Sequence, residues 1–480
     1  MLEKKNLTDL AESFSRFEIE CGMFHVKISG VKVWQYIRND IYDLHLRMIY
    51  GFFDGSGLQK ITGIEDKNRY KVWDRMKDKL MYNQTFIGRR DVLIFASARK
   101  VMDNNYKYRD VYTDIIDKKL EQSHYLLDVT RLPQASPNLI HIDIERFKKN
   151  KGITDEVINI SKEEFENKII RPIEIYYDIQ LNNNHRRQIL VLLQKRLEKR
   201  KSLAAYYSYI LEKSRPKIIL IVGVSFEMAV LCAVAKRRNI PVVVLQHGEI
   251  TSTEPIYNSQ KRINISTYPD YFFVFSELER KRGKFMIPSS RVIPVGYPEL
   301  DDYIKNTKSG KAEKEKKEIL IISCVDENLL KFTRELADKI DGTKYRIVYK
   351  LHPVEYGNWK KAYGSYLLHP NIDVAGDKSK IIYDFFMDAE WVLGMQSTCL
   401  YEATAFDVKI AIVDSPFKRD YEEFFELGRA NLISSVDDFL GIIDQKNVNS
   451  MASTAWFENN SMERVQRAID DIIASNIKGC

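Results

Sequence analysis

The sequence lacks the features that would place a protein outside the cytoplasm. Cysteine is scarce, with five residues in 480 and no CxxC pair, so we expect reduced thiols and no metal site. No run of about 18 uncharged apolar residues occurs, and the first twenty residues have no apolar stretch beside their positive charges. We therefore expect neither a membrane-spanning helix nor a secretion signal, and we predict a cytoplasmic protein.

Several catalytic motifs are also missing. The sequence contains no GxxxxGK[ST], GxGxxG, HExxH or GxSxG pattern, which removes the main support for an ATPase, a dehydrogenase, a zinc protease or a serine esterase. It has no DxD triplet at a strand end, which argues against a metal-dependent, single-domain glycosyltransferase. With 74 basic and 67 acidic residues, the net charge of +7 is too balanced for a nucleic-acid-binding protein. We expect no metal, no cofactor and no nucleic-acid partner.

The composition is that of a folded protein with two domains. Hydrophobic residues make up 44% of the chain and charged residues 29%, and a chain of this length exceeds one ordinary core. Short β-branched runs alternate with helix-period segments, which predicts parallel sheets wrapped by helices, the α/β class. The predicted strands are Asp91–Ser97, Tyr125–Thr130, Asn138–Ile144, Lys217–Gly223, Pro241–Gln246, Tyr271–Phe275, Val292–Val295, Glu318–Cys324, Tyr345–Leu351, Asn371–Val374, Trp391–Leu393 and Lys409–Val413.

Two stretches show a strand-helix-strand unit clearly. In one, Ser225 is placed to cap the helix that follows KIILIVG, and in the other Asp326 caps the helix after EILIISC. The mixed-charge run 306–317 is typical of a solvated linker. We therefore predict an accessory segment 1–85, a Rossmann-like domain 86–305, a second Rossmann-like domain 306–460, and a C-terminal helix 461–480 that docks through an apolar face.

The accessory segment has three interpretations. Residues 24–49 predict a small hairpin followed by an amphipathic, aromatic-rich helix. This helix could be a packed cap, a dimer contact or a helix lying on a membrane surface. We favour the packed cap.

Polar residues follow three of the predicted strands, and ligands of open parallel sheets bind beyond the carboxyl ends of strands. After Gly394, the sequence Gln396-Ser397-Thr398 opens a helix, where free N–H groups, hydroxyls and the helix dipole suit a phosphate. The alternative is that Ser397 only caps the helix.

Lys350-Leu351-His352-Pro353 ends another strand, and Pro353 fixes the chain direction there. His352 could donate a hydrogen bond to the phosphate of a leaving nucleotide, or it could be a structural hydrogen-bond partner.

The third strand end carries Gln246-His247-Gly248-Glu249. Gly248 permits a sharp turn. Either His247 or Glu249 could be a general base for an acceptor hydroxyl, because burial can bring both towards neutral pKa values. The alternative is an ordinary loop histidine and an exposed carboxylate.

Read together, these motifs resemble a known group. The order QHGE, RVIPVGYPELD with Gly296, KLHP and STCLYEATAFDVKIAIVD is similar to GT-B glycosyltransferases of bacterial capsule, lipopolysaccharide and teichoic acid synthesis. These are the His-Pro group of polysialyltransferases, Kdo transferases and CDP-glycerol phosphotransferases. The resemblance covers about Lys217 to Pro416.

The resemblance implies a fold, a reaction and roles for particular residues. The fold is GT-B, two Rossmann-like domains facing across a cleft. His352 and Ser397-Thr398 hold the donor phosphate, with Glu402 on the nucleotide side, while His247 matches the base of a Trp-His-Gly motif better than an acidic pair. The implied donor-binding and supporting residues are Lys350, His352, Pro353, Gln396, Ser397, Thr398 and Glu402, and Gln246, Gly248 and Gly296.

The implied partners are a nucleotide-sugar donor and an oligosaccharide or lipid-linked glycan acceptor. Peripheral contact with the inner membrane, through the basic, aromatic N-terminal region, stays open. We favour a CMP-activated ulosonic acid donor, with a CDP-polyol or a UDP- or TDP-sugar as alternatives. Two other functions stay open at this point: a sugar-nucleotide 2-epimerase of similar fold, and an inactive scaffold subunit of a capsule assembly complex.

Overall fold

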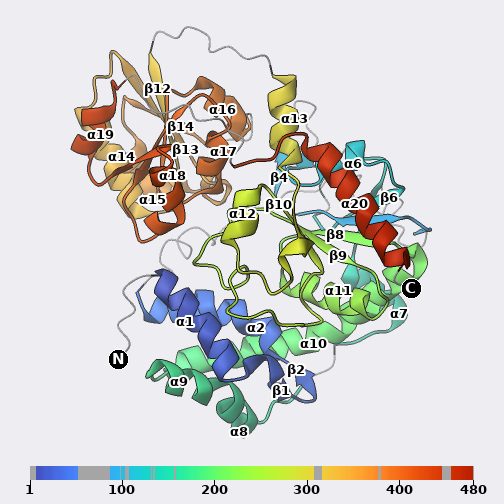
Figure 1. Ribbon diagram of the computed structural model, residues 1–480. Coiled ribbons are helices and arrows are strands. Elements are labelled where there is room, and N and C mark those ends of the chain that lie inside the picture. Colours follow the sequence, from blue (N-terminus) through green and yellow to red (C-terminus); the bar gives the residue numbers. More distant parts are fainter. Residues whose placement is uncertain are drawn as a thin grey trace. The chain divides into compact units, whose positions relative to one another are not determined.

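The computed structural model of the protein describes residues 7–51, 87–97, 99–102, 108–130, 132, 134, 136–155, 158–307, 316–376, 380–445 and 456–478 (Figure 1). The chain divides into two compact units. The first comprises the described residues of 1–51, 70–299 and 458–480, and the second those of 300–457. Most of the predicted linker, and residues 52–85 of the predicted accessory segment, lie outside the described residues.

The first unit is built on a parallel sheet of seven strands in the order β11-β10-β9-β8-β3-β6-β7. The strands are β3 (Val92–Phe95), β6 (His124–Asp128), β7 (Leu139–His141), β8 (Ile218–Val222), β9 (Val242–Leu245), β10 (Tyr271–Val274) and β11 (Val292–Pro294). In chain order this is the Rossmann sequence 3-2-1-4-5-6 with one further strand. The direction of winding reverses between β3 and β8.

The second unit has a parallel sheet of six strands in the order β14-β13-β12-β15-β16-β17. The strands are β12 (Lys317–Ile322), β13 (Tyr345–Lys350), β14 (Ile372–Ala375), β15 (Trp391–Gly394), β16 (Lys409–Val413) and β17 (Ala430–Ile433). This is again the order 3-2-1-4-5-6, and the reversal falls between β12 and β15. The predicted α/β class, with two Rossmann-like sheets, is confirmed.

The strands are continuous apolar runs because both faces of each sheet are covered by helices. β3, β9 and β15 are buried at every position. In the first unit the helices include α6 (Asp114–Lys119), α7 (Ile144–Lys151), α10 (Asn183–Ser214), α11 (Phe226–Lys236), α12 (Glu277–Arg282) and α20 (Ser461–Lys478). In the second they are α13 (Pro298–Asn306), α14 (Glu327–Lys339), α15 (Trp359–Leu367), α16 (Ile382–Asp388), α17 (Thr398–Ala403), α18 (Glu422–Glu426) and α19 (Val436–Ile442).

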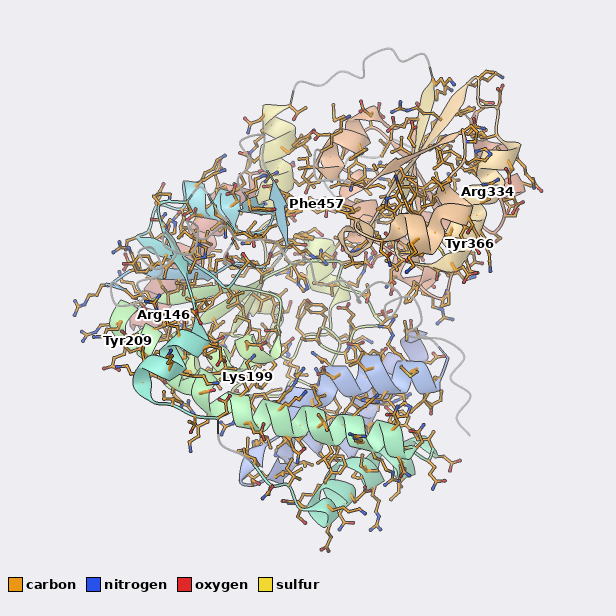
Figure 2. The ribbon with its side chains drawn as sticks, turned by 180° about the vertical axis from the view of Figure 1, so that it is seen from behind. Arg146, Lys199, Tyr209, Arg334, Tyr366 and Phe457 are labelled. Carbon is orange, nitrogen blue, oxygen red and sulfur yellow. The ribbon has the colours of Figure 1, made fainter. Side chains whose placement is uncertain are left out.

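Helix caps fall where the sequence predicts them. The Ser225 side chain accepts from the backbone N–H of Met228, and Asp326 accepts from two backbone N–H groups at the start of α14. Val465, Ile469 and Ile472 of α20 are buried in the core of the first unit. Figure 2 shows two of the helix pairings from behind: Tyr209 of α10, which contacts Phe147 of α7, and Tyr366 of α15, whose hydroxyl donates to Glu327 of α14 at 3.1 Å.

The N-terminal segment forms a helical layer of the first unit. It contains α1 (Leu7–Glu20), the short hairpin β1 (Lys27–Ile28) and β2 (Val31–Lys32), α2 (Trp34–Asp40), a π-helical segment (Ile41–Leu46) and α3 (Arg47–Ile49). These elements lie against α10 and the neighbouring helices α8 (Lys162–Phe165) and α9 (Arg171–Tyr177) (Figure 1).

The aromatic side chains of this layer are buried. Phe17 contacts both Trp34 and Tyr177, at ring distances of 5.7 and 5.5 Å. The Glu18 carboxylate forms a buried bidentate pair with Arg38, 2.6 Å on each side, and also accepts from the Trp34 indole at 2.6 Å. The predicted hairpin and helix are therefore present, with their aromatic face packed inside the unit.

Each predicted strand has a counterpart, but other elements were missed. β17, the hairpin β4 (Lys100–Met102) and β5 (Tyr108–Asp110), and the extent of α10 were not predicted. β17 carries few β-branched residues, and α10 is amphipathic only in part, so neither gives a strong periodic signal. None of the described helices is long and apolar enough to cross a bilayer.

Candidate functional site

The carboxyl ends of the two sheets carry the predicted site residues. In a Rossmann-ordered sheet a crevice forms where the winding reverses, beyond the strand ends. In the first unit this point lies between β3 and β8, next to β9 and its Gln246-His247-Gly248-Glu249 turn. In the second unit it lies between β12 and β15, next to the Gln396-Ser397-Thr398 turn.

The ring of His247 lies directly on the backbone of Gly223 at the end of β8. A Cβ on Gly223 would come within 2.9 Å of the His247 Cε1 atom, and Gly223 has a left-handed φ of +66°. Only glycine fits there without strain and without displacing the ring. The absence of a side chain at Gly223 therefore lets the imidazole lie against the end of β8, next to the point where the winding of the sheet reverses.

Two side chains from the segment after β3 hold His247 from the other side. The Tyr112 hydroxyl donates to the His247 carbonyl, and the Arg99 guanidinium donates both to that carbonyl at 3.4 Å and to the Tyr112 hydroxyl at 2.8 Å. The Tyr112 ring meets the imidazole edge-on at 6.3 Å. Arg99 itself is exposed, so the site places a cation beside the imidazole at the sheet edge.

Burial and this cation together control the protonation of His247. Desolvation, and then repulsion from Arg99, lower the pKa of His247 from 6.5 to about 4. The ring is therefore neutral at physiological pH. Its Nδ1 atom is buried and makes no hydrogen bond within the part of the chain that the structure describes. A neutral imidazole can accept a proton from a hydroxyl group through its unprotonated ring nitrogen.

The neighbours of His247 in the turn have different environments. Gln246 is buried and acts as a clamp: its amide donates to the Gly248 carbonyl at 2.7 Å and accepts from the Phe275 backbone N–H at 2.7 Å. Gln246 therefore fixes the turn to the end of β10. Glu249 is partly buried in the same turn, so it is not the exposed carboxylate of the alternative interpretation.

Gly296 does not contact His247 but affects the packing of the aromatic residues next to it. Its φ is +84°, and a Cβ there would lie 2.2 Å from the Glu458 carbonyl oxygen, so glycine lets the chain before α20 approach β11. The next residue, Tyr297, stacks on Tyr112 at 5.8 Å and on Phe275 at 4.9 Å. Gly296 thereby supports the aromatic stack behind His247.

In the second unit the strand register brings the other two motifs to one edge. Lys350 of β13 pairs with Ile322 of β12, and Ile321 pairs with Leu393 of β15. Ile321 also pairs with Tyr349 of β13, so His352 and Gln396 each lie three residues beyond one row of paired residues, on the two strands that flank β12. Neighbouring strands are about 4.8 Å apart, so the two backbones are separated by roughly 10 Å. That spacing suits side chains that reach for one phosphate or diphosphate between them.

A buried carboxylate, that of Glu355, stabilises the His352-Pro353 turn. Glu355 accepts from the His352 backbone N–H at 2.6 Å and is 1% exposed, and burial raises its pKa. The His352 Nδ1 accepts a long bond of 3.4 Å from the Val354 N–H. In the neutral ring this puts the proton on Nε2, which makes that atom a hydrogen-bond donor.

Lys350 lies beside the turn and is largely buried. Its ammonium donates to the Tyr356 hydroxyl and lies 4.7 Å from the centre of that ring and 5.7 Å from the centre of Phe385. These contacts hold a positive charge at the end of β13.

The Ser397-Thr398 turn differs from the sequence expectation in one respect. We expected its backbone N–H groups to be free, but the Ser397 N–H donates to the Tyr421 hydroxyl at 2.8 Å and the Cys399 N–H donates to the Ser397 side chain at 3.2 Å. Ser397 does cap α17. The expectation failed because Tyr421 comes from a distant segment that the local pattern cannot reveal.

The remaining predicted residues of this turn are placed as follows. Gln396 and Thr398 are half-buried at the strand end and at the first position of α17. Glu402 is 7% exposed, within the buried side of α17.

Sequence reasoning missed four residues of these edges: Arg99, Tyr112, Gly223 and Glu355. Gly223 directly follows β8, so a systematic reading of every strand end would have found it, whereas Arg99 lies four residues beyond β3 and directly before β4. Tyr112 and Glu355 act through contacts with backbone atoms of other segments or turns, which leave no pattern in the sequence.

Within the described ranges no three or more histidine, cysteine or acidic side chains are grouped so that they could hold a metal ion. Cys324, between the two motifs of the second unit, has its pKa raised to about 12 by burial, so its thiol stays protonated.

No protein-family model matches the sequence, and no curated protein matches it significantly. Solved structures do match. One is a putative UDP-N-acetylglucosamine 2-epimerase from Listeria monocytogenes, at 11% identity over 80% of this chain and 97% of that one, with a TM-score of 0.49. Another is S. aureus MnaA with UDP, at 15% identity over 80% and 96%, with a TM-score of 0.48.

A third is the wall teichoic acid polymerase TagF, at 10% identity over 84% of this chain and 94% of that one, with a TM-score of 0.42. Values this low support no inference about the activity of this chain.

Proposed function

We propose that this chain is a metal-independent GT-B glycosyltransferase that transfers a sugar from a nucleotide-activated donor to a glycan hydroxyl in bacterial surface polysaccharide synthesis. The observation that carries the proposal is the state of His247. It is a partly buried, neutral imidazole whose Nδ1 makes no hydrogen bond among the described residues, set on Gly223 beside Arg99, at the point where the winding of the first sheet reverses.

In the proposed reaction, His247 is the general base. The unprotonated ring nitrogen takes the proton of the acceptor hydroxyl as the hydroxyl oxygen bonds to the anomeric carbon. The bond from that carbon to the donor phosphate breaks, and its electron pair leaves on the phosphate. A pKa of about 4 makes a weak base. An anion near Arg99 would offset its repulsion, which is the smaller of the two causes that lower this pKa after desolvation, so we expect the base to strengthen when an anionic substrate binds.

The second unit is proposed to hold the donor phosphate. Three groups lie at the carboxyl ends of the strands of this sheet. His352 supplies a neutral hydrogen-bond donor through Nε2, Lys350 supplies a cation, and the Thr398 hydroxyl supplies a further hydrogen-bond donor. We favour CMP-activated ulosonic acid as the donor, whose single phosphate leaves as CMP. A CDP-polyol or a UDP- or TDP-sugar would place a diphosphate across the same strand ends.

A thermal-shift series with CMP, CDP, UDP and TDP is the first test. A nucleotide that binds the folded chain raises its melting temperature, and at one hundred times Kd the stabilisation is about 2.7 kcal/mol. We expect one nucleotide to give a clearly larger shift than the others. If none shifts the transition, the chain binds no such donor and the proposal fails, which would leave a scaffold role.

The nucleotide that binds identifies the donor sugars to be tested for turnover, with and without a glycan acceptor. Release of the nucleotide that depends on the acceptor supports a transferase. Conversion of the nucleotide sugar when it is supplied alone would instead indicate a 2-epimerase.

Three variants then assign the residues. His247→Ala is expected to reduce turnover by roughly 10² to 10⁴, the usual worth of a general base. His352→Ala is expected to weaken donor turnover while the fold stays intact, since His352 is exposed at a strand end. Glu249→Ala is the comparison for His247, because both lie in one turn. If Glu249→Ala abolishes turnover and His247→Ala does not, Glu249 is the base.

A further inference from the structure

One cavity of the first unit lies at the amino ends of the strands, at the opposite end of the sheet from His247. It has a volume of about 940 Å³, and its walls include the residues just before three strands: Pro241, Asp270 and Arg291. His247 lies at the other end of β9, six residues from Pro241, or about 20 Å along an extended strand. The cavity is therefore separate from the proposed transfer site.

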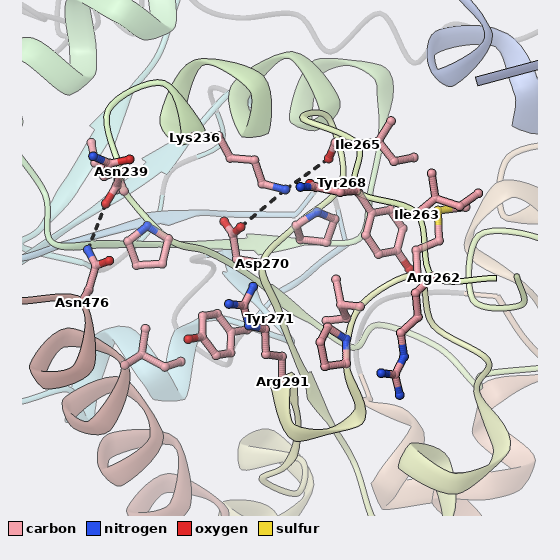
Figure 3. Close-up of a pocket in the computed structure, with 18 of the residues that line it drawn as sticks. Lys236, Asn239, Arg262, Ile263, Ile265, Tyr268, Asp270, Tyr271, Arg291 and Asn476 are labelled. Carbon is pink, nitrogen blue, oxygen red and sulfur yellow. Dashed lines mark hydrogen bonds and ion pairs between the residues drawn. The ribbon is translucent and has the colours of Figure 1, made fainter. Parts of the chain in front are cut away.

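The charges in the cavity are unbalanced. Lys236 is neutralised by Asp270 at 3.4 Å and also donates to the Ile265 carbonyl. Arg262 and Arg291 have no carboxylate partner among the described residues, and the Arg291 guanidinium lies 5.5 Å from the centre of the Tyr271 ring. Figure 3 shows the paired lysine in the middle of the view and Arg291 beside Tyr271. Two guanidinium groups are thus available for an anionic ligand.

The uncharged lining suits sugar hydroxyls. Asn239, Asn264 and Asn476 line the cavity, and a carboxamide can both donate to and accept from a hydroxyl group. Asn476 of α20 donates to the Asn239 carbonyl at 2.9 Å, which joins the two walls at that side (Figure 3). The rings of Tyr268 and Tyr271 add flat apolar faces with polar tips.

The positive surface continues beyond the cavity. A second hollow of about 260 Å³ is lined by Lys261, Arg262, Arg280 and Lys284, so Arg262 belongs to both. Arg280 is paired with Glu277 at 2.7 Å and Lys284 lies 3.7 Å from Glu12, which leaves Lys261 and Arg262 as the excess positive charge of this hollow. A ligand with repeated, spaced anions would use both hollows.

We propose that these two hollows bind an acidic oligosaccharide, a hydroxylated chain that carries repeated carboxylate or phosphate groups. Arg262 and Arg291 bind its anions bidentately, and the asparagine amides bind its hydroxyls. The cavity is within the size range of ligand pockets, about 300 to 1,000 Å³. The site holds a glycan chain at a distance from the strand ends where transfer is proposed, and its binding does not require catalysis.

Calorimetric titration of the full chain tests the proposal with three probes of four units each: α2,8-linked sialic acid, glycerol phosphate and neutral maltotetraose. We expect at least one anionic probe to bind, and maltotetraose to bind at least about tenfold more weakly, because a charged hydrogen bond is worth roughly a factor of ten. The two anionic probes distinguish carboxylate from phosphate. Equal binding of maltotetraose, or no binding of either anion, would overturn the proposal.

Paired variants locate the site. The double variant Arg262→Ala/Arg291→Ala should lose at least about tenfold in affinity for the anionic probe. Arg187→Ala/Lys195→Ala is the matched control, since it removes two exposed charges from α10 outside the cavity, and its affinity should stay within twofold. Equal losses in both double variants would show charge attraction without a site, which refutes the proposal.

Two further measurements separate this inference from other possibilities. A single-stranded RNA dodecamer is the first probe. If it binds more tightly than the glycans, and if Arg262→Ala/Arg291→Ala abolishes this binding, the hollows form a nucleic-acid site and the proposal is refuted. The thermal shift given by nucleotides should be the same in Arg262→Ala/Arg291→Ala as in the wild type. If nucleotides raise the melting temperature but no glycan binds, only the glycan site is refuted. If glycans bind but no nucleotide raises the melting temperature, only the donor site is refuted.

Discussion

Replacement of Gly223 by alanine tests the catalytic role of His247 without touching the imidazole itself. Gly223 has a φ of +66°, and an alanine in the left-handed region costs about 1–2 kcal/mol. The new methyl group would lie 2.9 Å from the His247 Cε1 atom, closer than a carbon contact allows. The ring, a movable side chain, must turn away. We therefore expect a modest loss of stability together with a loss of turnover of about 10² or more, because the base leaves its position.

Gly152 provides the matched control for this experiment. It ends α7 in the same unit with a φ of +63°, and a Cβ there would meet no atom within 4 Å. Gly152→Ala should carry the same backbone cost as Gly223→Ala but leave turnover unchanged. Urea unfolding gives the two stabilities, and initial rates with the donor chosen by thermal shift give the two activities.

Two results would refute the reasoning about Gly223. If Gly223→Ala and Gly152→Ala have equal turnover, the position of the His247 ring does not matter to the reaction. If Gly223→Ala is far less stable than Gly152→Ala, the ring cannot move aside, and a loss of activity would report misfolding and not the loss of a base.

Three further predictions concern stability and the donor turn. Burial, and then repulsion from a second histidine, lower the pKa of His45 from 6.5 to about 4, so the unfolded chain binds a proton that the folded chain does not. Stability should therefore fall as pH decreases from 6.5 to 4, with His45 responsible for on the order of 3 kcal/mol, and His45→Gln should flatten this slope in urea unfolding. Glu355→Ala removes the acceptor of the His352 N–H, a cap worth about 1 kcal/mol, and should raise the donor KM about fivefold. Glu18→Ala leaves the buried Arg38 unpaired and should cost about 3–5 kcal/mol in unfolding free energy.

Each of these predictions has a control and a contrary outcome. His25→Gln removes an exposed imidazole and should keep the wild-type pH slope; equal slopes in all three proteins would exclude His45 as the source. Glu355→Gln keeps an oxygen acceptor and should restore most of the donor affinity, whereas two equally impaired variants would show that charge, not the hydrogen bond, matters. Lys118→Ala removes an exposed ion pair with Asp114 and should cost about 0.5 kcal/mol or less; a Glu18→Ala loss as small as this would contradict the proposed worth of the buried pair.

Local patterns in the sequence were sufficient for every strand of the two sheets except β17. Buried parallel strands are uninterrupted apolar runs, and helix caps are short-range hydrogen bonds, so β9, α11 and α14 can be recognised from neighbouring residues alone. The same reasoning indicated which strand ends carry polar residues. The domain boundaries and the roles of the site residues stay predictions.

The three-dimensional structure decided which of these residues meet. Strand order placed the end of β9 next to β8, so that Gly223 and His247 touch although they are 24 positions apart, and it brought Arg99 to the same place from a third segment. The fold also brings Tyr421 to the Ser397 turn, where its hydroxyl accepts a hydrogen bond from the Ser397 N–H. Contacts between distant segments depend on how the whole chain packs, and no local pattern of residues records them. The sequence therefore determined which polar residues follow each strand. Only the fold determined which of them contact one another, and hence their hydrogen bonds and protonation.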